Sequence, residues 1–357
     1  MDHSIRRRRL AERLDALDVQ AILVTRLVNV RYLTGFSGSN AQLLLSADDA
    51  RFFTDFRYAE QSRHEVPDLE RTVYTTSFFD HLGPGCLDLG VSRIGFEAAG
   101  VTYQFFQDLN ERTTGLEFTP VGPEVEQLRW IKDAEELALI RRAQAVTDEG
   151  FEKVAGKLVE GMTERDLAIE LEFAMRQAGG DGLAFDTIAA FGENAAEPHH
   201  APTTRQLRRG DVVELDFGAL VDGYHSDMTR TVAFGEPRAE IREIYEIVRA
   251  AQQAGIDAVR AGVDGQDADA ASRKVIEDAG YGDRFGHSLG HGVGLEIHEG
   301  PSLRRATSEI VPAGAVVTVE PGIYLPGIGG VRIEDMVEVT EDGCIPMPST
   351  TKDLLVL

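Results

Sequence analysis

Two aspartates, Asp216 and Asp227, lie in a segment with the pattern of a β-hairpin. Within 212–231, two apolar-rich runs flank Asp222-Gly223, a dipeptide that suits a two-residue turn. With that turn at the tip, both aspartates face one side of the sheet as diagonal neighbours, about 7 to 8 Å apart, and Gly218 leaves room between them. Two carboxylates so placed repel each other unless a cation lies between them or one binds a proton.

The residues around these aspartates decide between two interpretations. A solvated pair on an exposed sheet face is the simpler one. However, apolar side chains flank the aspartates at Val212, Val213, Leu215, Phe217 and Val232. Buried strands have little reason to carry unpaired carboxylates, because a desolvated charge is costly. The hairpin therefore favours a metal site.

Three histidines, His287, His291 and His298, occupy a glycine-rich segment at 286–299. Four glycines within nine residues of it preclude a stable helix and let the backbone approach whatever the histidines bind. A single histidine is usually structural or exposed. Three in one short segment are better explained by function, since neutral imidazole is a common metal ligand and proton carrier.

Two further carboxylates, Glu320 and Glu334, end apolar strand-like runs. Each taken alone could be an ordinary surface residue at the end of a strand. Alternation along the second run places Arg332 on the same face as Glu334, where it is expected to orient a neighbouring carboxylate through charge-assisted hydrogen bonds.

Together, the four carboxylates and the glycine-flanked His291 form a ligand set rich in hard oxygen. Such a set suits two divalent ions that share carboxylates, and manganese, cobalt, zinc or iron fits it better than a soft metal does.

Two domains are expected to position these residues, since 357 residues correspond to about two domains of roughly 150 residues each. Residues 1–122 alternate helical and strand-like patterns and predict an α/β domain. Prolines and a glycine at 120–123 precede a long helical pattern over 128–143, and the remainder, 123–357, predicts an α+β domain. Helices are expected at 58–64, 103–112, 164–177, 241–260 and 266–279, and strands at 21–24, 42–45, 51–54, 71–75, 93–96, 116–119, 212–217, 228–234, 316–319 and 331–339.

Composition excludes several classes of partner. With 60 acidic and 36 basic residues, the net charge of −24 would be repelled by nucleic-acid phosphates and by anionic membranes. No window approaches the roughly 18 apolar residues that span a bilayer. The basic run Arg6–Arg9 lacks a following apolar stretch and is interpreted as the exposed start of a helix, not as a targeting signal. Two cysteines, Cys86 and Cys344, are too few for a disulfide framework, which favours a cytoplasmic protein.

Residues of these types in this order resemble the pita-bread metallopeptidases, the group that includes aminopeptidase P, prolidase and methionine aminopeptidase. The resemblance implies a creatinase-like N-terminal α/β domain at 1–122 and a pita-bread catalytic domain at 123–357. It also implies two divalent metal ions, with manganese favoured and cobalt, zinc or iron as alternatives. The implied metal ligands are Asp216, Asp227, His291, Glu320 and Glu334.

The resemblance assigns roles to further residues. His199 and His298 would be catalytic, stabilising the tetrahedral intermediate or holding the substrate, and Glu320 would also carry the proton to the leaving nitrogen. His200, next to His199, is the weaker candidate. Three more residues match supporting or pocket positions, namely Arg332 and Thr229 beside the ligands and His287 near the substrate.

Segments 29–39 and 53–58 resemble the creatinase-type N-terminal domain, and segment 130–137 resembles the start of the catalytic domain in the proline-specific branch of the group. The implied activity is hydrolysis of the bond between an N-terminal residue and proline, in Xaa-Pro dipeptides or longer peptides, by a metal-bridging hydroxide. Proline-containing peptides would be the substrates, and a homodimer is implied. The alternatives are another amide hydrolase on this fold, similar to methionine aminopeptidase, and a non-catalytic peptide-binding module. Creatinase shares the fold but lacks the metal-binding carboxylates, so the intact set argues against it.

Overall fold

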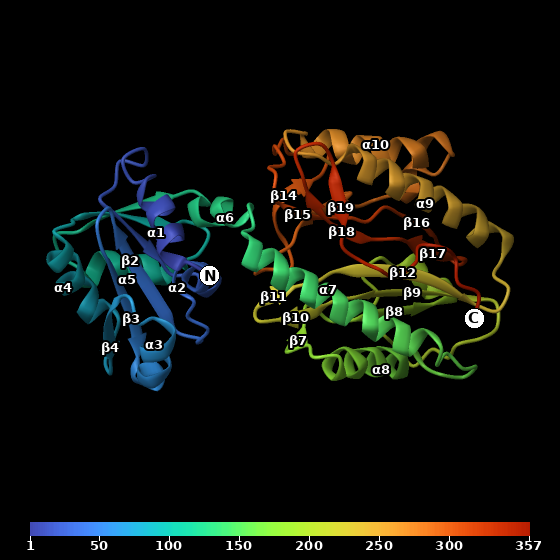
Figure 1. Cartoon of the computed structure of the whole chain (residues 1–357), viewed down its shortest axis with the longest axis horizontal. Coiled ribbons are helices and arrows are strands. Elements are labelled where there is room, and N and C mark those ends of the chain that lie inside the picture. Colours follow the sequence, from blue (N-terminus) through green and yellow to red (C-terminus); the bar gives the residue numbers. More distant parts are fainter. The chain divides into compact units, whose positions relative to one another are not determined.

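The chain divides into two compact units, Met1–Arg129 and Trp130–Leu357, in a computed structural model that describes all 357 residues (Figure 1). The boundary expected after residue 122 precedes this division. The difference arises because helix α6 (Glu124–Arg129) contacts α1 (His3–Ala11) and α2 (Leu27–Thr34) and so belongs with the first unit.

The first unit is a mixed six-stranded sheet with helices packed against it. The strand order is β4-β3-β2-β1-β5-β6, with β1 antiparallel to β2 and parallel to β5. Besides α1, α2 and α6, its elements are β1 (Ala21–Val24), β2 (Ala41–Ser46), β3 (Ala50–Asp55), α3 (Ala59–Glu65), β4 (Glu70–Tyr74), α4 (Phe79–Leu89), β5 (Arg93–Glu97), α5 (Tyr103–Arg112) and β6 (Glu117–Val121). The predicted α/β class is confirmed for this unit.

The basic run at the N-terminus differs from its prediction. Arg6 and Arg7 are buried, and their guanidinium groups donate to the backbone oxygens of Tyr32 and Leu33 at 3.1 and 2.8 Å. These carbonyls lie near the end of α2, where cationic donors are favourable. Arg6 and Arg7 therefore tie α1 to α2, whereas Arg8 and Arg9 are exposed on α1 as predicted.

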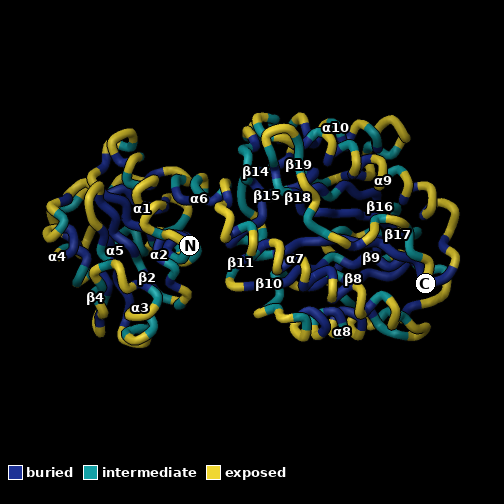
Figure 2. Tube along the Cα trace, in the orientation of Figure 1, coloured by how far each residue is buried: buried dark blue, intermediate teal, exposed yellow.

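The second unit holds two helix pairs and four small sheets. Helices α7 and α8 pack with the strands β8, β9 and β12, and α9 and α10 pack with β13 to β19 (Figure 1). The helices are α7 (Ala134–Ala155), α8 (Glu164–Gln177), α9 (Ala239–Ala258) and α10 (Gly265–Asp278). The strands are β7 (Gly182–Leu183), β8 (Ile188–Phe191), β9 (Asp211–Phe217), β10 (Ala219–Val221), β11 (Tyr224–His225), β12 (Met228–Phe234), β13 (Gly290–Gly292), β14 (Glu299–Leu303), β15 (Val316–Val319), β16 (Gly322–Leu325), β17 (Gly329–Arg332), β18 (Asp335–Val339) and β19 (Cys344–Pro346). Figure 2 shows these strands mostly buried, whereas the outer faces of the helices are exposed.

The helical pattern over 128–143 is two helices, not one. Helix α6 ends at Arg129, and α7 begins after Asp133, whose carboxylate accepts from the backbone of Glu136 while the Glu136 side chain accepts from the backbone of Asp133. This capping box starts a new helix independently of the apolar spacing. Ile131, which the pattern placed on the apolar face, is half exposed in the connection.

The strand predicted over 331–339 is interrupted as well. It consists of β17, which pairs with β16, and β18, which pairs with β15. The break falls at Ile333 and Glu334, and the amide of Glu334 donates to the backbone oxygen of Thr229 at 3.1 Å. The two strands belong to different sheets, so simple alternation does not relate Arg332 to Glu334.

The predicted hairpin is confirmed in turn and register. Asp222 and Gly223 both have positive φ, 47° and 78°, as a primed two-residue turn requires. Val221 pairs with Tyr224, and Asp216 pairs with Thr229, in the single register that the turn predicts. The side chains of Asp216 and Asp227 therefore share one face of the hairpin.

Gly218 is needed for a reason other than the expected one. A Cβ at this position would lie 1.9 Å from the backbone oxygen of Ser226, so the space is taken by the opposite strand. We expect Gly218→Ala to lower the free energy of unfolding by about 3 kcal/mol, because the strands cannot move apart without disturbing the hairpin. Gly343→Ala is the matched control, since nothing lies within 4 Å of its added Cβ. Equal urea midpoints for the two variants would contradict this account.

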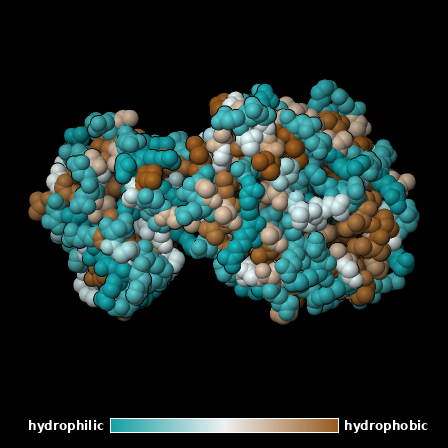
Figure 3. Space-filling model, viewed as in Figure 1, coloured by the Kyte–Doolittle hydropathy of each residue, from teal (hydrophilic) through white to brown (hydrophobic).

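The surface agrees with a composition in which 27% of the residues are charged. On the face shown in Figure 3, hydrophilic residues prevail over both units. None of the helices has the length and apolar character that crossing a bilayer would require.

Candidate active site

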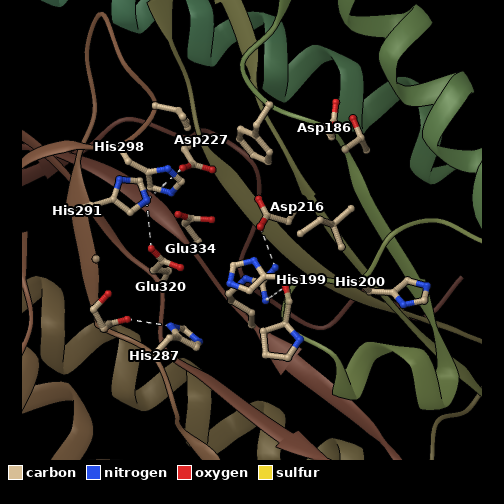
Figure 4. A pocket seen from close by; sticks show the side chains of 18 of the residues that line it. Asp186, His199, His200, Asp216, Asp227, His287, His291, His298, Glu320 and Glu334 are labelled. Carbon is tan, nitrogen blue, oxygen red and sulfur yellow. Dashed lines mark hydrogen bonds and ion pairs between the residues drawn. The ribbon is translucent and has the colours of Figure 1, made fainter. Parts of the chain in front are cut away.

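One cavity of about 910 Å³ in the second unit collects the predicted site residues. Its walls include all of them except Thr229, whose hydroxyl donates to Glu334 (Figure 4 shows the cavity). The lining residues from this set are His199, Asp216, Asp227, His287, His291, His298, Glu320, Arg332 and Glu334. They come from β9, β13, β17 and the connections next to β8, β12, β14 and β15, so both halves of the unit contribute.

His291 presents an unprotonated nitrogen to the carboxylates. Its Nδ1 lies 3.1 Å from the backbone oxygen of Gly292 and donates to it, which leaves Nε2 as the lone-pair nitrogen. Burial, with nearby His298, lowers the pKa of His291 to about 4, so the ring is neutral. Nε2 lies 3.4 Å from Glu320 Oε1 and 3.6 Å from Asp227 Oδ2. A lone pair facing carboxylate oxygens is repulsive without a cation between them.

The carboxylates converge on the same point. Ligand atoms of Asp227, His291 and Glu334 all lie within 4.8 Å of one another. Burial and repulsion from neighbouring carboxylates raise the pKa of Asp227 and that of Glu334 well above their usual ranges. Burial and the charge of Asp216 raise that of Glu320 to about 8. Desolvated acidic groups placed this close together fit a site for divalent cations.

Asp216 is held at one oxygen and available at the other. Its Oδ2 accepts from Arg332 Nη2 at 2.8 Å, whereas the buried Oδ1 has no hydrogen-bond partner. Arg332 Nε donates to Thr229 Oγ1 at 3.0 Å, and Thr229 donates to Glu334 Oε2 at 2.7 Å. A similar partner supports Glu320, because Thr318 Oγ1 donates to its Oε1 at 3.1 Å. These contacts orient the carboxylates. Asp216 Oδ1, which is buried without a hydrogen-bond partner, is available to bind a metal ion.

His287 is fully engaged by protein groups. Its Nδ1 lies 2.9 Å from the backbone oxygen of Ser288, and its Nε2 lies 2.9 Å from the hydroxyl of Tyr324. That hydroxyl accepts from Arg332 at 2.9 Å, so it donates to His287 Nε2. Burial lowers the pKa of His287 to about 4. His287 thus fixes the hydroxyl of Tyr324, which in turn orients the arginine that donates to Asp216.

Among the histidines that line the cavity, His199 and His298 make no hydrogen bond to protein groups. The ring of His298 packs edge-on against that of His291, with centroids 4.3 Å apart, and burial lowers its pKa. Figure 4 shows His199 beside Asp216, whereas His200 is directed away from the other labelled side chains. His200 Nε2 and Nδ1 lie 2.9 Å from Glu164 and Glu197, respectively.

Without divalent ions, stability is expected to fall as pH rises. The raised pKa values of Asp227, Glu334 and Glu320, the last about 8 against 4.5, mean that folding favours the protonated acids. Their contribution is complete below the unfolded pKa and is lost as pH rises to about 8, by on the order of 3 kcal/mol. Between pH 4 and 6.5 the lowered pKa values of His287 and His291 act in the opposite direction, so the test lies above this range. Melting temperatures in EDTA should decrease from pH 6.5 to pH 8, and added Mn²⁺ should remove the decrease. A metal-free protein that grows more stable over this range would contradict the expectation.

The sequence interpretation missed four residues that shape the site. Glu214 is fully buried and lies 3.0 Å from Arg332, and burial raises its pKa to about 7. This residue could have been found from the sequence, because it lies two residues before Asp216 and therefore on the same face of an apolar strand. The other three are Glu164, Tyr324 and Lys132, which act through contacts between distant segments and leave no local pattern.

A neutral imidazole, converging carboxylates and an open cavity define a metal-binding hydrolytic site. The model of metallopeptidase family M24 matches residues 138–341, and that of the creatinase/prolidase N-terminal domain matches residues 6–131. The chain belongs to this metallopeptidase family and is a metal-dependent hydrolase.

Three relatives illustrate the similarity. An Xaa-Pro dipeptidase of Pyrococcus furiosus is 35% identical over 97% of this chain and 98% of its own. The structure of an Xaa-Pro dipeptidase from Bacillus anthracis is 39% identical, with a TM-score of 0.97 and full coverage of both chains. That of an X-Pro aminopeptidase from Thermotoga maritima is 36% identical, with a TM-score of 0.90, and covers 97% of this chain and 100% of its own. These matches confirm the predicted creatinase-type N-terminal domain and pita-bread catalytic domain.

Proposed function

We propose that the protein is an exopeptidase that hydrolyses the peptide bond between an N-terminal residue and proline. The observation that carries the proposal is the intact convergence of Asp227, His291 and Glu334 in one cavity. It is supported by the full-length similarity to proteins named Xaa-Pro dipeptidase and X-Pro aminopeptidase.

The metal site is proposed to hold two divalent ions, with manganese favoured over cobalt, zinc and iron. The residues that would hold them are Asp216, Asp227, His291, Glu320 and Glu334. In support, hard oxygen donors dominate the set, the imidazole is neutral, and Asp216 keeps one oxygen without a partner. Such ions, when bound, lower the pKa of water and polarise a carbonyl group.

The remaining steps use side chains of the protein. Proline nitrogen leaves as an amine and needs a proton, which Glu320 is placed to carry because it lines the cavity beside His291. His199 and His298 line the same cavity and are proposed to donate hydrogen bonds to the carbonyl oxygen as negative charge develops on it. Their imidazoles would also hold the polar ends of a short peptide.

Arg304 is the cation at the cavity that a substrate carboxylate would meet. It is exposed, whereas the other lining arginine, Arg332, is buried and paired with Asp216. In a dipeptide the carboxylate belongs to the proline itself, and we propose that Arg304 binds it. We expect Arg304→Gln to raise KM for Ala-Pro about tenfold and to leave KM for Ala-Pro-Ala-amide, which has no carboxylate, nearly unchanged. Equal increases for both substrates would contradict this role.

The decisive experiment compares turnover of Ala-Pro, Ala-Pro-Ala and Met-Ala by the protein loaded with Mn²⁺, Co²⁺ or Zn²⁺, before and after chelation. Cleavage of the proline peptides, lost on chelation and restored by metal, is the expected result. A preference for Ala-Pro would indicate a dipeptidase, and cleavage of Ala-Pro-Ala an aminopeptidase. Cleavage of Met-Ala alone would overturn the substrate assignment. Binding of peptides without any turnover would indicate a binding module.

The protein is also proposed to act as a homodimer, as its resemblance to the proline-specific peptidases implied. Sedimentation equilibrium checks this directly. The expected species has twice the chain mass of 39.1 kDa, and a species of the single chain mass would contradict it.

A further inference from the structure

Glu164, the first residue of α8, is fully buried and binds a segment that is distant in sequence. We call residues 191–203 the His199 segment, because it leads from β8 through His199. The Glu164 carboxylate accepts five hydrogen bonds, and every donor belongs to this segment. A buried carboxylate that accepts five hydrogen bonds restricts the positions of the residues that donate them.

The two oxygens of Glu164 hold opposite ends of the His199 segment. Oε1 accepts from the backbone amide of Phe191 and from the side-chain amide of Asn194, both at 2.9 Å. Oε2 accepts from the amide of Thr203 at 2.9 Å and from its hydroxyl at 2.6 Å. His200 Nε2 lies 2.9 Å from the same oxygen. One carboxylate thus closes the segment into a loop.

His200 anchors the middle of the loop through two glutamates, Glu164 and Glu197, that do not line the cavity. Its two ring nitrogens face two carboxylates, Glu164 and Glu197, and carboxylates accept only. Both nitrogens therefore donate, which makes the ring an imidazolium. Although burial lowers its pKa, the hydrogen bonds to the two glutamates raise it overall. The charged ring fixes the backbone next to His199.

His199 has no such anchor of its own. Its imidazole faces the cavity and makes no hydrogen bond to protein groups, so the backbone on either side determines where the ring lies. On the preceding side, the oxygen of Pro198 accepts a long hydrogen bond from Arg332, at 3.4 Å. On the following side the anchor is His200, and through it Glu164.

We propose that Glu164 is a positioning residue for His199, acting through the backbone of the His199 segment and the imidazolium of His200. Its effect on turnover rests on the proposed peptidase function. Glu164 does not line the cavity and does not touch the metal ligands, so it acts by holding His199 at the distance and angle that the reaction needs.

The test substitutes Glu164→Gln, which keeps the shape but turns one acceptor oxygen into an amide donor. That amide must face donors of the His199 segment, so one end of the loop loses its anchor. We expect kcat for the preferred Xaa-Pro substrate to fall about a hundredfold, with Mn²⁺ affinity by calorimetry within threefold of the parent. The matched control is Glu170→Gln on the same helix, where the exposed carboxylate pairs only with Lys157. That control should behave as the parent.

A double-mutant cycle separates positioning from general damage. If Glu164 works through His199, then Glu164→Gln has no further effect on kcat once His199→Ala is present. A full additional hundredfold loss, or a matching loss of Mn²⁺ affinity, would overturn the proposal. Should Glu164→Gln fail to fold, His200→Gln tests the same link, because it removes the imidazolium and leaves the other four donors to Glu164 in place.

Amide hydrogen exchange tests the anchor independently of activity. In Glu164→Gln, or in His200→Gln if the former does not fold, exchange should accelerate at least tenfold within 191–203, and the rest of the unit should keep its rates. Unchanged exchange in this segment would overturn the proposal even if turnover fell. If the parent protein cleaves no Xaa-Pro peptide, the proposed function fails, and the exchange result alone then decides whether Glu164 holds the His199 segment.

Discussion

The Asp227→Asn variant is expected to lose hydrolytic activity by about a thousandfold or more and to become more stable in the absence of metal. Asp227 is buried and its ligand oxygen lies in the cluster with His291 and Glu334. Asparagine keeps the shape but removes the charge that would balance a divalent ion. In the metal-free protein that same charge is unfavourable, since burial and the carboxylate of Glu334 raise the pKa of Asp227. Its removal should therefore raise the melting temperature in EDTA.

These two opposite effects distinguish a metal ligand from a structural aspartate. The measurements are kcat/KM on Ala-Pro with Mn²⁺, calorimetric titration with Mn²⁺, and thermal unfolding in EDTA. Asp283→Asn is the control, because its carboxylate is exposed and belongs to no buried cluster. Retained activity, or a metal-free variant that is less stable than the parent, would contradict the assignment of Asp227.

Features of the site that depend on short-range pattern could be predicted. The register of β9 and β12 followed from one turn. A two-residue primed turn fixes which residues pair, and side chains along each strand alternate between the two faces of the sheet. The same rule placed Asp216 and Asp227 on one face. His291 was conspicuous because it stands between glycines, and a Cβ at Gly290 or Gly292 would meet opposing backbone oxygens at 2.0 and 2.2 Å.

Features that depend on tertiary contacts could not be predicted. The break within 128–143 is a different case, because the capping box of Asp133 and Glu136 that starts α7 is a local signal, which the apolar spacing obscured. Alternation suggested that Arg332 and Glu334 share a strand face, whereas their link is the hydroxyl of Thr229 from another strand. Glu164 is an ordinary helix-start glutamate in the sequence, and only the fold brings the His199 segment to it.

Lys132→Met is expected to lower the free energy of unfolding by about 3 kcal/mol. Lys132 Nζ lies 2.8 Å from Glu299 Oε1, and the two side chains are only 1% and 3% exposed. Methionine has a similar volume but no charge, so the buried carboxylate of Glu299 loses its ion pair with Lys132. Glu299 follows His298 directly, and a shift of this carboxylate should also reduce turnover.

The double variant Lys132→Met/Glu299→Gln tests whether the cost comes from the broken ion pair. It leaves neither charge buried, so it should recover at least half of the stability lost in Lys132→Met. The single tryptophan, Trp130, packs against Gly300 and reports unfolding of this region by fluorescence in urea. Lys274→Met, which breaks an exposed pair with Asp278, is the control and should cost less than about 0.5 kcal/mol. If the double variant is no more stable than Lys132→Met, the loss comes from packing and not from the broken ion pair.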